Sequence, residues 1–181
     1  RAYAIHAISH YKGKEIESLL REALRDSYYK VRINAANGLA ERRNPSDSIP
    51  ILIYKAERDP EIKVREAAIQ ALAQIGGKDA FSAVKTLFET DTTPYVIRVT
   101  AFEALVQHNL EGSISSFDTV IDDEWEKERS TLIEYIGKVL SKEKSPVLKD
   151  IFKKLLGHEW YIIKIHALRG IGKNKFSDLK D

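Results

Sequence analysis

The stretch Val64–Gly77, VREAAIQALAQIGG, holds the pattern that decides the fold of this protein. Arg65 serves as its reference position, and Ala68, Ala71 and Leu72 lie three, six and seven residues further on. On an α-helix these offsets share one face, so the stretch predicts a helix with a narrow apolar stripe. Two of the three stripe positions are alanine, although a larger residue would bury more apolar surface. Small residues there indicate that a neighbouring helix approaches closely.

The same pattern recurs along the chain. With the cation as anchor, the copies begin at Arg1, Arg32, Arg65, Arg98, Arg129 and Lys164, at spacings of 31, 33, 33, 31 and 35 residues. Three residues beyond the anchors lie Ala4, Ala35, Ala68, Ala101, Leu132 and Ala167. Six residues beyond lie Ala7, Gly38, Ala71, Ala104, Tyr135 and Gly170, and seven beyond lie Ile8, Leu39, Leu72, Leu105, Ile136 and Ile171. Agreement of three columns over six copies indicates a repeat protein.

A second helical pattern separates successive copies, with apolar residues at three- and four-residue steps. These patterns cover residues 14–25, 46–58, 78–89, 111–122 and 142–156. The sequence contains no alternating strand pattern of useful length. It therefore predicts an all-α fold, an alpha-alpha superhelix: a right-handed α-solenoid of about five to six helical hairpins with a period of about 33 residues.

We expect one solenoid domain over residues 1–181, and we expect the native chain to continue N-terminally because the first copy is only an inner helix. The predicted parts are a half-repeat at 1–13, repeats at about 14–45, 46–77, 78–110, 111–141 and 142–173, and a tail at 174–181. Asp59 is expected to cap the following helix, with Pro60 at its first position. Gly76-Gly77 and Gly172 are expected to end helices in a left-handed conformation.

Composition bounds the function. Apolar residues make up 43% and charged residues 31% of the chain, and the net charge of +2 gives no argument for nucleic acid. No apolar run is long enough for a membrane-spanning helix. With no cysteine, the chain offers no disulfide, thiol nucleophile or cysteine zinc site, and its compartment stays open.

The string DPEIKVREAAIQALAQIGG, from Asp59 to Gly77, resembles the short HEAT-like repeat of the phycobilisome-lyase type. The resemblance covers nearly the whole chain and implies that Asp and Arg residues form a ladder between successive repeats. The residues in these positions are Asp26, Arg32, Asp59, Arg65, Arg98, Asp123 and Arg129. The sixth copy departs from the pattern, with His158 at the Asp position and Lys164 at the Arg position.

The resemblance also implies that the second helix of each pair lines a concave side. Offsets +2, +5 and +9 would then point into the groove, opposite the packing stripe. These positions hold Tyr3, His6, His10, Asn34, Asn37, Glu41, Ala67, Gln70, Gln74, Thr100, Glu103, Gln107, Thr131, Glu134, Lys138, His166, Arg169 and Lys173. This mixed, hydrogen-bonding set suits a polypeptide partner, or else it is an ordinary solvated helix face.

Charges and aromatic residues are unevenly placed. Residues 111–135 carry a net charge of −6 and residues 136–181 a net charge of +6. The two blocks could steer a partner of mixed charge, or they could neutralise each other between neighbouring repeats. Aromatic residues are expected at the starts of inner helices, where they either pack as core or form an exposed edge that binds a peptide: Tyr28, Tyr29, Tyr95, Trp125, Trp160 and Tyr161.

Few residues suggest chemistry. His6 and His10 have the four-residue spacing of metal ligands on a helix, but no third ligand is evident, and surface histidines are the preferred interpretation. His158-Glu159 is the only His-Glu pair, and the adjacent acids Asp122, Asp123 and Glu124 are interpreted as a solvated helix start. Phosphate-binding loops, nucleophile elbows and paired carboxylates are missing from the sequence. We therefore predict no catalytic residue, no cofactor and no metal site.

These observations favour a non-catalytic scaffold that binds another protein, a peptide or flanking parts of its own chain, through the concave face or the aromatic edge. One alternative is an enzyme or enzyme accessory of the bilin-lyase type, which the resemblance brings in. The other is nucleic-acid binding through the basic C-terminal third, although basic groove residues are confined to Lys138, Arg169 and Lys173.

Overall fold

The computed structural model describes residues 1–42 and 46–176, apart from the side chain of Ser46. Its described part contains eleven α-helices, three short 3-10 helices and no strand. The prediction of an all-α repeat solenoid is confirmed. The chain divides into two compact units, Arg1–Asn109 and Leu110–Asp181, and each is described by itself. The predicted domain organisation stays a prediction.

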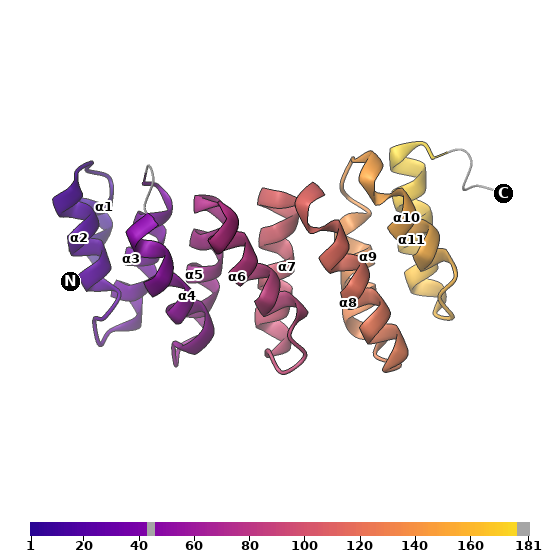
Figure 1. The fold of residues 1–181 in the computed structure, drawn as a ribbon, viewed down its shortest axis with the longest axis horizontal. Coiled ribbons are helices and arrows are strands. Elements are labelled where there is room, and N and C mark those ends of the chain that lie inside the picture. The colour runs from indigo at the N-terminus through magenta and orange to yellow at the C-terminus, as the bar shows by residue number, and fades with distance from the viewer. Residues whose placement is uncertain (43–45, 177–181) are drawn as a thin grey trace. The chain divides into compact units, whose positions relative to one another are not determined.

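Unit 1 contains seven α-helices, and its inner helices lie side by side (Figure 1). The inner helices are α1 (Ala2–Ser9), α3 (Tyr29–Ala40), α5 (Ile62–Ile75) and α7 (Tyr95–Asn109). The outer helices are α2 (Lys14–Ala23), α4 (Ile49–Arg58), preceded by the 3-10 turn η1 (Ser46–Ser48), and α6 (Lys78–Glu89). Each outer helix runs antiparallel to the inner helix that follows it, so all inner helices point the same way and begin at the same edge.

Unit 2 contains two further helix pairs. Outer helix α8 (Ile114–Glu126) follows the turn η2 (Glu111–Ser113) and packs on inner helix α9 (Ser130–Leu140). Outer helix α10 (Lys149–Leu156) follows η3 (Pro146–Leu148) and packs on inner helix α11 (Tyr161–Asn174). The two inner helices, α9 and α11, also pack against each other. Both units thus repeat one arrangement, an antiparallel pair stacked on the next pair.

The small residues of the apolar stripe lie where the sequence predicts. Ala35, Ala68 and Ala101 are completely buried. A Cβ atom added at Gly38 would lie 2.7 Å from the Cβ of Ser9 on α1, so even alanine would be too large there. Close helix approach is therefore the reason that the stripe carries alanine and glycine, since close-packed interiors leave no room for an added methyl group.

Unit 2 uses glycine differently. A Cβ at Gly170 on α11 would lie 2.2 Å from the ring of Phe152, a fully buried residue of α10. The close approach at Gly170 therefore joins the two helices of one pair, whereas Gly38 faces the preceding inner helix. In the fifth copy, where Leu132 and Tyr135 replace the small residues, Gly137 is buried instead, and its added Cβ would lie 3.4 Å from the Cβ of His166.

Several predicted helix boundaries need correction. Helix α5 begins at Ile62 and not at Pro60, and Asp59 bonds the backbone N–H of Glu61 at 3.1 Å, which makes a tight turn before the helix and not a cap on it. Gly76 and Gly77 have positive φ angles of 72° and 86°, but their ψ angles of −163° and 168° lie outside the left-handed helical region that was expected for a stop. Gly172 lies inside α11, and Lys175 adopts the left-handed conformation with φ 57°.

The predicted helix start at the acidic residues 122–124 is wrong. Asp122, Asp123 and Glu124 lie in the last turns of outer helix α8 and not at the start of an inner helix, and Glu124 is buried. Trp125 belongs to the same helix end. The prediction placed this helix end too early because acidic residues are more common in the first turn of a helix than in its last.

Candidate functional site

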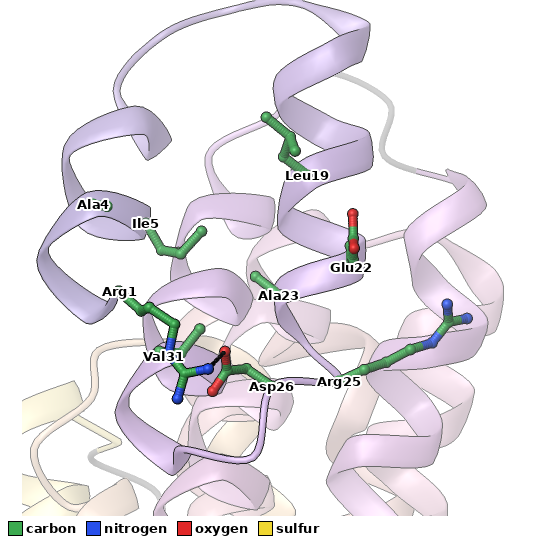
Figure 2. A pocket seen from close by; sticks show the side chains of 9 residues that line it. All are labelled: Arg1, Ala4, Ile5, Leu19, Glu22, Ala23, Arg25, Asp26 and Val31. Atoms are coloured by element: carbon green, nitrogen blue, oxygen red, sulfur yellow. Dashed lines mark ion pairs between the residues drawn. The ribbon is translucent and has the colours of Figure 1, made fainter.

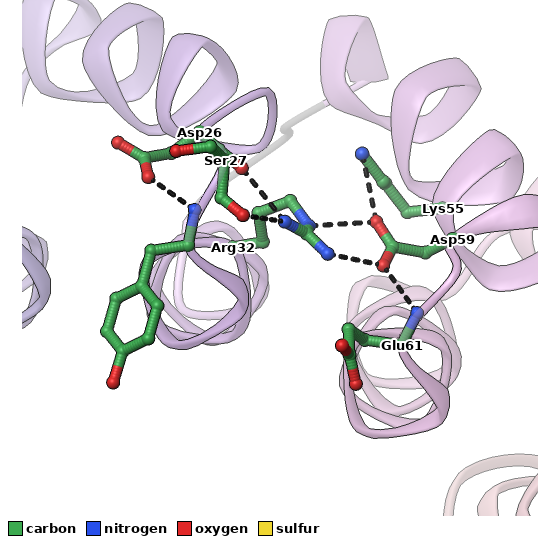
Figure 3. A network of polar contacts seen from close by, with 7 residues as sticks. Asp26, Ser27, Arg32, Lys55, Asp59 and Glu61 are labelled. Atoms are coloured by element: carbon green, nitrogen blue, oxygen red, sulfur yellow. Dashed lines mark hydrogen bonds and ion pairs between the residues drawn. The ribbon is translucent and has the colours of Figure 1, made fainter.

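A buried ion pair joins two successive repeats of unit 1. The guanidinium of Arg32 on α3 makes two hydrogen bonds to the carboxylate of Asp59, 2.7 Å from Nη2 to Oδ1 and 2.9 Å from Nε to Oδ2 (Figure 3). Its Nη1 donates to the carbonyls of Asp26 and Ser27 at 2.9 and 3.0 Å, in the turn that precedes α3. One arginine thus fastens its own turn to the turn of the next repeat.

The carboxylate of Asp59 has four donors. Lys55 Nζ lies 3.0 Å from Oδ2, and the N–H of Glu61 donates to Oδ1. Burial raises the pKa of Asp59, but the hydrogen bonds from Arg32, Lys55 and Glu61 outweigh burial and hold that pKa below its usual value. The carboxylate therefore stays charged in the interior and acts structurally.

The other ladder residues make different contacts. Arg1 and Asp26 repeat the same step one copy earlier at 3.3 Å, with Arg1 largely exposed. The Nε atoms of Arg65 and Arg98 each donate at 2.9 Å to a carbonyl at the end of their own outer helix, Ala56 and Phe88. In unit 2, Arg129 pairs with Glu124 at 2.7 Å and with Asp123 at 3.7 Å, all within one repeat. The ladder predicted between all repeats stays a prediction beyond the two pairs in unit 1.

His158 takes over the turn-forming role of aspartate in the last copy. Its Nδ1 accepts the backbone N–H of Trp160 at 3.1 Å, just as Asp59 accepts that of Glu61 and Asp26 that of Tyr28. Accepting this bond requires a neutral imidazole. The His158 ring packs at a tilt of 50° against Trp125, with ring centroids 4.4 Å apart. Burial lowers the pKa of His158; the nearby Glu159 raises that pKa and Lys164 lowers it, both by less than burial does.

Most residues predicted for the groove are accessible on the inner helices. Thr100 and His166 differ, being 9% and 5% exposed. The Thr100 hydroxyl donates to the carbonyl of Val96, and burial lowers the pKa of His166, as the nearby Arg169 also does. The exposed or half-buried residues are Tyr3, His6, His10, Asn34, Asn37, Glu41, Ala67, Gln70, Gln74, Glu103, Gln107, Thr131, Glu134, Lys138, Arg169 and Lys173. We call the part of this set on α1, α3, α5 and α7, together with the C-cap residues His10 and Glu41, the inner-helix face of unit 1.

Several residues of this face line a pocket of about 460 Å³ between α1 and α3. Helix α1 and its N-cap contribute Arg1, Ala2, Tyr3 and His6. The α3 side contributes Tyr28, Lys30, Ile33 and Asn34. We call this the Tyr28 pocket. The sequence analysis missed Lys30 and Ile33 because the predicted groove positions of each copy start two residues after the anchor, here Arg32. Lys30 could have been found, because it lies one helical turn before Asn34 on the same face.

The predicted aromatic edge exists in part. In unit 1, Tyr28 is 42% and Tyr95 48% exposed at the starts of α3 and α7, and Ile62 is 47% exposed at the start of α5. In unit 2, Trp160 and Tyr161 are exposed at the start of α11, whereas Trp125 is partly covered against His158. Apart from Trp125, these side chains are exposed at the helix starts and are not part of the core.

A second pocket opens between α1, α2 and the start of α3 (Figure 2). Ile5, Leu19 and Val31 are among its apolar lining residues, and charged residues also line it: Arg1, Glu22, Arg25 and Asp26. Arg1 and Asp26 form an ion pair there. Ala4 is exposed there, whereas its repeat equivalents are buried.

Charge compensation occurs between the helix pairs of unit 2. Lys154 on α10 lies between Asp118 and Asp122 on α8, 2.8 Å from Asp122 Oδ1. Burial lowers the pKa of Lys154, but the two carboxylates outweigh burial and raise it above its usual value. Lys154, from the basic residues 136–181, therefore neutralises part of the acidic stretch 111–135. This agrees with the second interpretation of these charges, in which neighbouring repeats neutralise each other.

The histidines proposed for a metal lie close to each other. The rings of His6 and His10 are 5.1 Å apart, edge to face, on the exposed side of α1. Two nitrogen ligands are too few for a structural zinc site. Surface histidines remain the preferred interpretation.

Repeated helix pairs with small inward residues and arginine–aspartate pairs between repeats define a HEAT-like repeat protein. The sequence pattern of the spirochaete HEAT repeat proteins matches residues 1–181, and the chain belongs to this family. It is also similar to the bilin biosynthesis protein PecE of Nostoc sp. strain PCC 7120, at 32% identity over 90 residues. The aligned part is 49% of this chain and 35% of that relative. Within the described residues, the helices are too short or too polar to cross a membrane.

Proposed function

We propose that this protein is a scaffold that binds another protein through the inner-helix face of unit 1. One observation supports this above all: four parallel inner helices lie side by side and expose hydrogen-bonding side chains on one side, such as Asn37, Gln74 and Gln107. Stacked repeats build an extended surface of this kind without a chemical centre. Membership of a HEAT repeat family fits the same role.

The chemistry of the face favours a polypeptide. Amide side chains offer both donors and acceptors, which match the N–H and C=O groups of a peptide backbone. Duplex DNA instead requires a continuous row of cations along the phosphates. The inner-helix face mixes amides with Glu41 and Glu103, which would repel phosphate.

Site-specific photo-crosslinking tests this proposal. Benzoylphenylalanine is introduced singly at Asn37, Gln74 and Gln107, and the cross-linked products are identified by mass spectrometry. Exposed positions on the outer helices, Ser18, Glu57 and Ser82, serve as matched controls.

We expect one partner protein to be captured at the three inner positions and not at the three outer ones. Equal capture from both sets would refute binding through this face. Cross-links only within the chain would show that flanking parts of the same polypeptide are the partner.

A role as accessory in bilin chemistry is the second candidate, and the similarity to PecE is the observation that favours it. A tetrapyrrole needs an extended apolar groove. Three accessible groove positions of α5 and α7 are polar instead: Gln70, Gln74 and Glu103. Titration with biliverdin distinguishes the two roles. A saturable shift of the biliverdin absorption band would support a role in bilin chemistry, and an unchanged band would exclude bilin binding and leave the scaffold role.

A further inference from the structure

We propose that the Tyr28 pocket receives an acidic segment of a partner protein, one apolar side chain of which fills the pocket. The inference rests on the proposed scaffold function and adds to it the chemistry of the partner. Three properties of the pocket carry it: an apolar, aromatic lining, a lining without carboxylates, and a side-chain amide on its α3 wall.

The apolar lining comes from Tyr28, Tyr3 and Ile33, and a hydrogen bond holds the turn that carries Tyr28. The N–H of Tyr28 donates to Asp26 Oδ1 at 2.8 Å, which fixes the turn from which the Tyr28 ring projects. Tyr3, which is 91% exposed, lines the pocket from α1, and Ile33 lines it from α3. Two tyrosines beside an aliphatic residue offer large contact area at low cost in side-chain entropy, which is typical of binding hot spots.

The charge of the lining has one sign. Arg1, His6 and Lys30 line the pocket, and none of the described lining residues carries a carboxylate. Asp26 pairs with Arg1 at 3.3 Å but does not line the pocket, and Lys30 lies 5.9 Å from the centroid of the Tyr29 ring. Charge complementarity therefore favours aspartate or glutamate on the partner, beside the buried apolar side chain.

Asn34 offers a contact for the peptide backbone. Its Nδ2 donates to the carbonyl of Ala2 at 2.9 Å and so bridges α3 and α1. Its Oδ1 has no donor among the described residues, although Asn34 lies only half-buried in the pocket lining. An N–H group of an extended segment would supply that donor.

The same edge continues beyond the pocket. Ile62 and Tyr95 begin the next two inner helices and are about half exposed. The first turns of α3 and α7 contain no acidic residue, whereas the start of α5 carries the exposed Glu61 at its N-cap. A segment running from the pocket along this edge would therefore meet further exposed apolar side chains.

Fluorescence anisotropy with synthetic peptides tests the proposal. The probe is a fluorescein-labelled peptide with one phenylalanine between two Asp-Glu pairs. Two further peptides replace the phenylalanine with alanine or the acids with Lys-Arg pairs. We expect the acidic phenylalanine peptide to bind at least tenfold more tightly than either.

Protein variants locate the binding. Tyr28→Ala and Lys30→Glu are each expected to weaken the acidic peptide about tenfold, and Lys30→Glu to strengthen the Lys-Arg peptide. The controls are Tyr54→Ala, an exposed tyrosine on α4, and Lys14→Glu, an exposed lysine on α2. Both should leave binding unchanged, and circular dichroism checks that every variant is folded.

The proposal fails if the acidic peptide does not bind, if the controls weaken it as much as the pocket variants, or if duplex DNA or a second copy of the chain competes for the pocket in its place. Cross-linking of a partner at Gln74 and Gln107 would then still support the scaffold function. Loss of cross-linking at all inner positions would instead remove both proposals.

Discussion

Replacing Asp59 with asparagine should strongly destabilise unit 1. Asparagine keeps the shape of the side chain and can still accept the N–H of Glu61. It removes the negative charge that faces Arg32 and Lys55, whose side chains are 7% and 13% exposed. The substitution therefore isolates the charge from the packing and the turn.

The expected loss is about 3–5 kcal/mol, the range found when one partner of a buried ion pair is removed. The structure supports this range because the guanidinium of Arg32 stays buried but loses the opposite charge and the acceptor oxygen of its 2.9 Å Nε bond, and only the 2.7 Å Nη2 bond to Oδ1 keeps an acceptor. Replacing both partners, with Arg32→Met and Asp59→Leu, should cost less than Asp59→Asn alone, since the buried guanidinium is removed together with its carboxylate and only Lys55, the more exposed of the two cations, loses its partner.

Hydrogen exchange of the amides in α3 and α5 measures the effect locally, and urea unfolding followed by circular dichroism measures it for the whole chain. Glu66→Gln is the control: it removes the exposed Lys63–Glu66 pair, 2.7 Å long, and should cost less than about 1 kcal/mol. If Asp59→Asn and Glu66→Gln destabilise equally, the reasoning about the buried charge is wrong. Because the pKa of Asp59 is lowered on folding, its contribution should be complete above its unfolded value of 3.8 and disappear as the pH falls through the folded pKa.

Two further predictions concern unit 2. Gly170→Ala should destabilise unit 2 by about 1–3 kcal/mol, because the added Cβ would lie 2.2 Å from the Phe152 ring. Gly172→Ala should be neutral or stabilise α11 by up to about 1 kcal/mol, because no atom lies within 4 Å of its added Cβ. Urea unfolding of both variants measures the difference. The pKa values of His158 and His166 are lowered on folding, so the free energy of unfolding should fall as the pH drops below about 6.5. Between the unfolded and the folded pKa, each histidine should contribute a slope of about 1.4 kcal/mol per pH unit, and below the folded pKa the loss should level off. A pH series of unfolding curves for wild type and for His158→Gln/His166→Gln should show this slope only in the wild type, and an unchanged slope in the double variant would contradict the assignment.

The repeat was predictable because stacking imposes the same requirement on every copy. Alanine at Ala35, Ala68 and Ala101 recurs where backbones approach, and this recurrence alone establishes helix pairs of one type. Gly38 was predictable only in part: its column indicates a small residue, but which residue it contacts, Ser9, follows only from the three-dimensional structure.

Features that occur once were beyond the sequence. Gly172 and Lys175 show this for helix ends, because glycine suits a left-handed stop yet lysine adopts it here. His166 has the offset of an exposed residue and is nevertheless buried beside Gly137, which is specific to the fifth copy. The Tyr28 pocket likewise depends on which side chains of two adjacent copies happen to face each other.

The arginine contact that spans two turns also limits how the gene for such a chain can change in length. Because Arg32 bonds carbonyls in Asp26–Ser27 and the carboxylate of Asp59, adding a residue to either turn would displace an atom by up to about 3.5 Å, beyond hydrogen-bonding range. Gly77, between one pair and the next, has no atom within 4 Å of its Cβ position. Insertions and deletions should therefore accumulate over evolutionary time at junctions such as Gly77 and be rare at the turns that hold the aspartates.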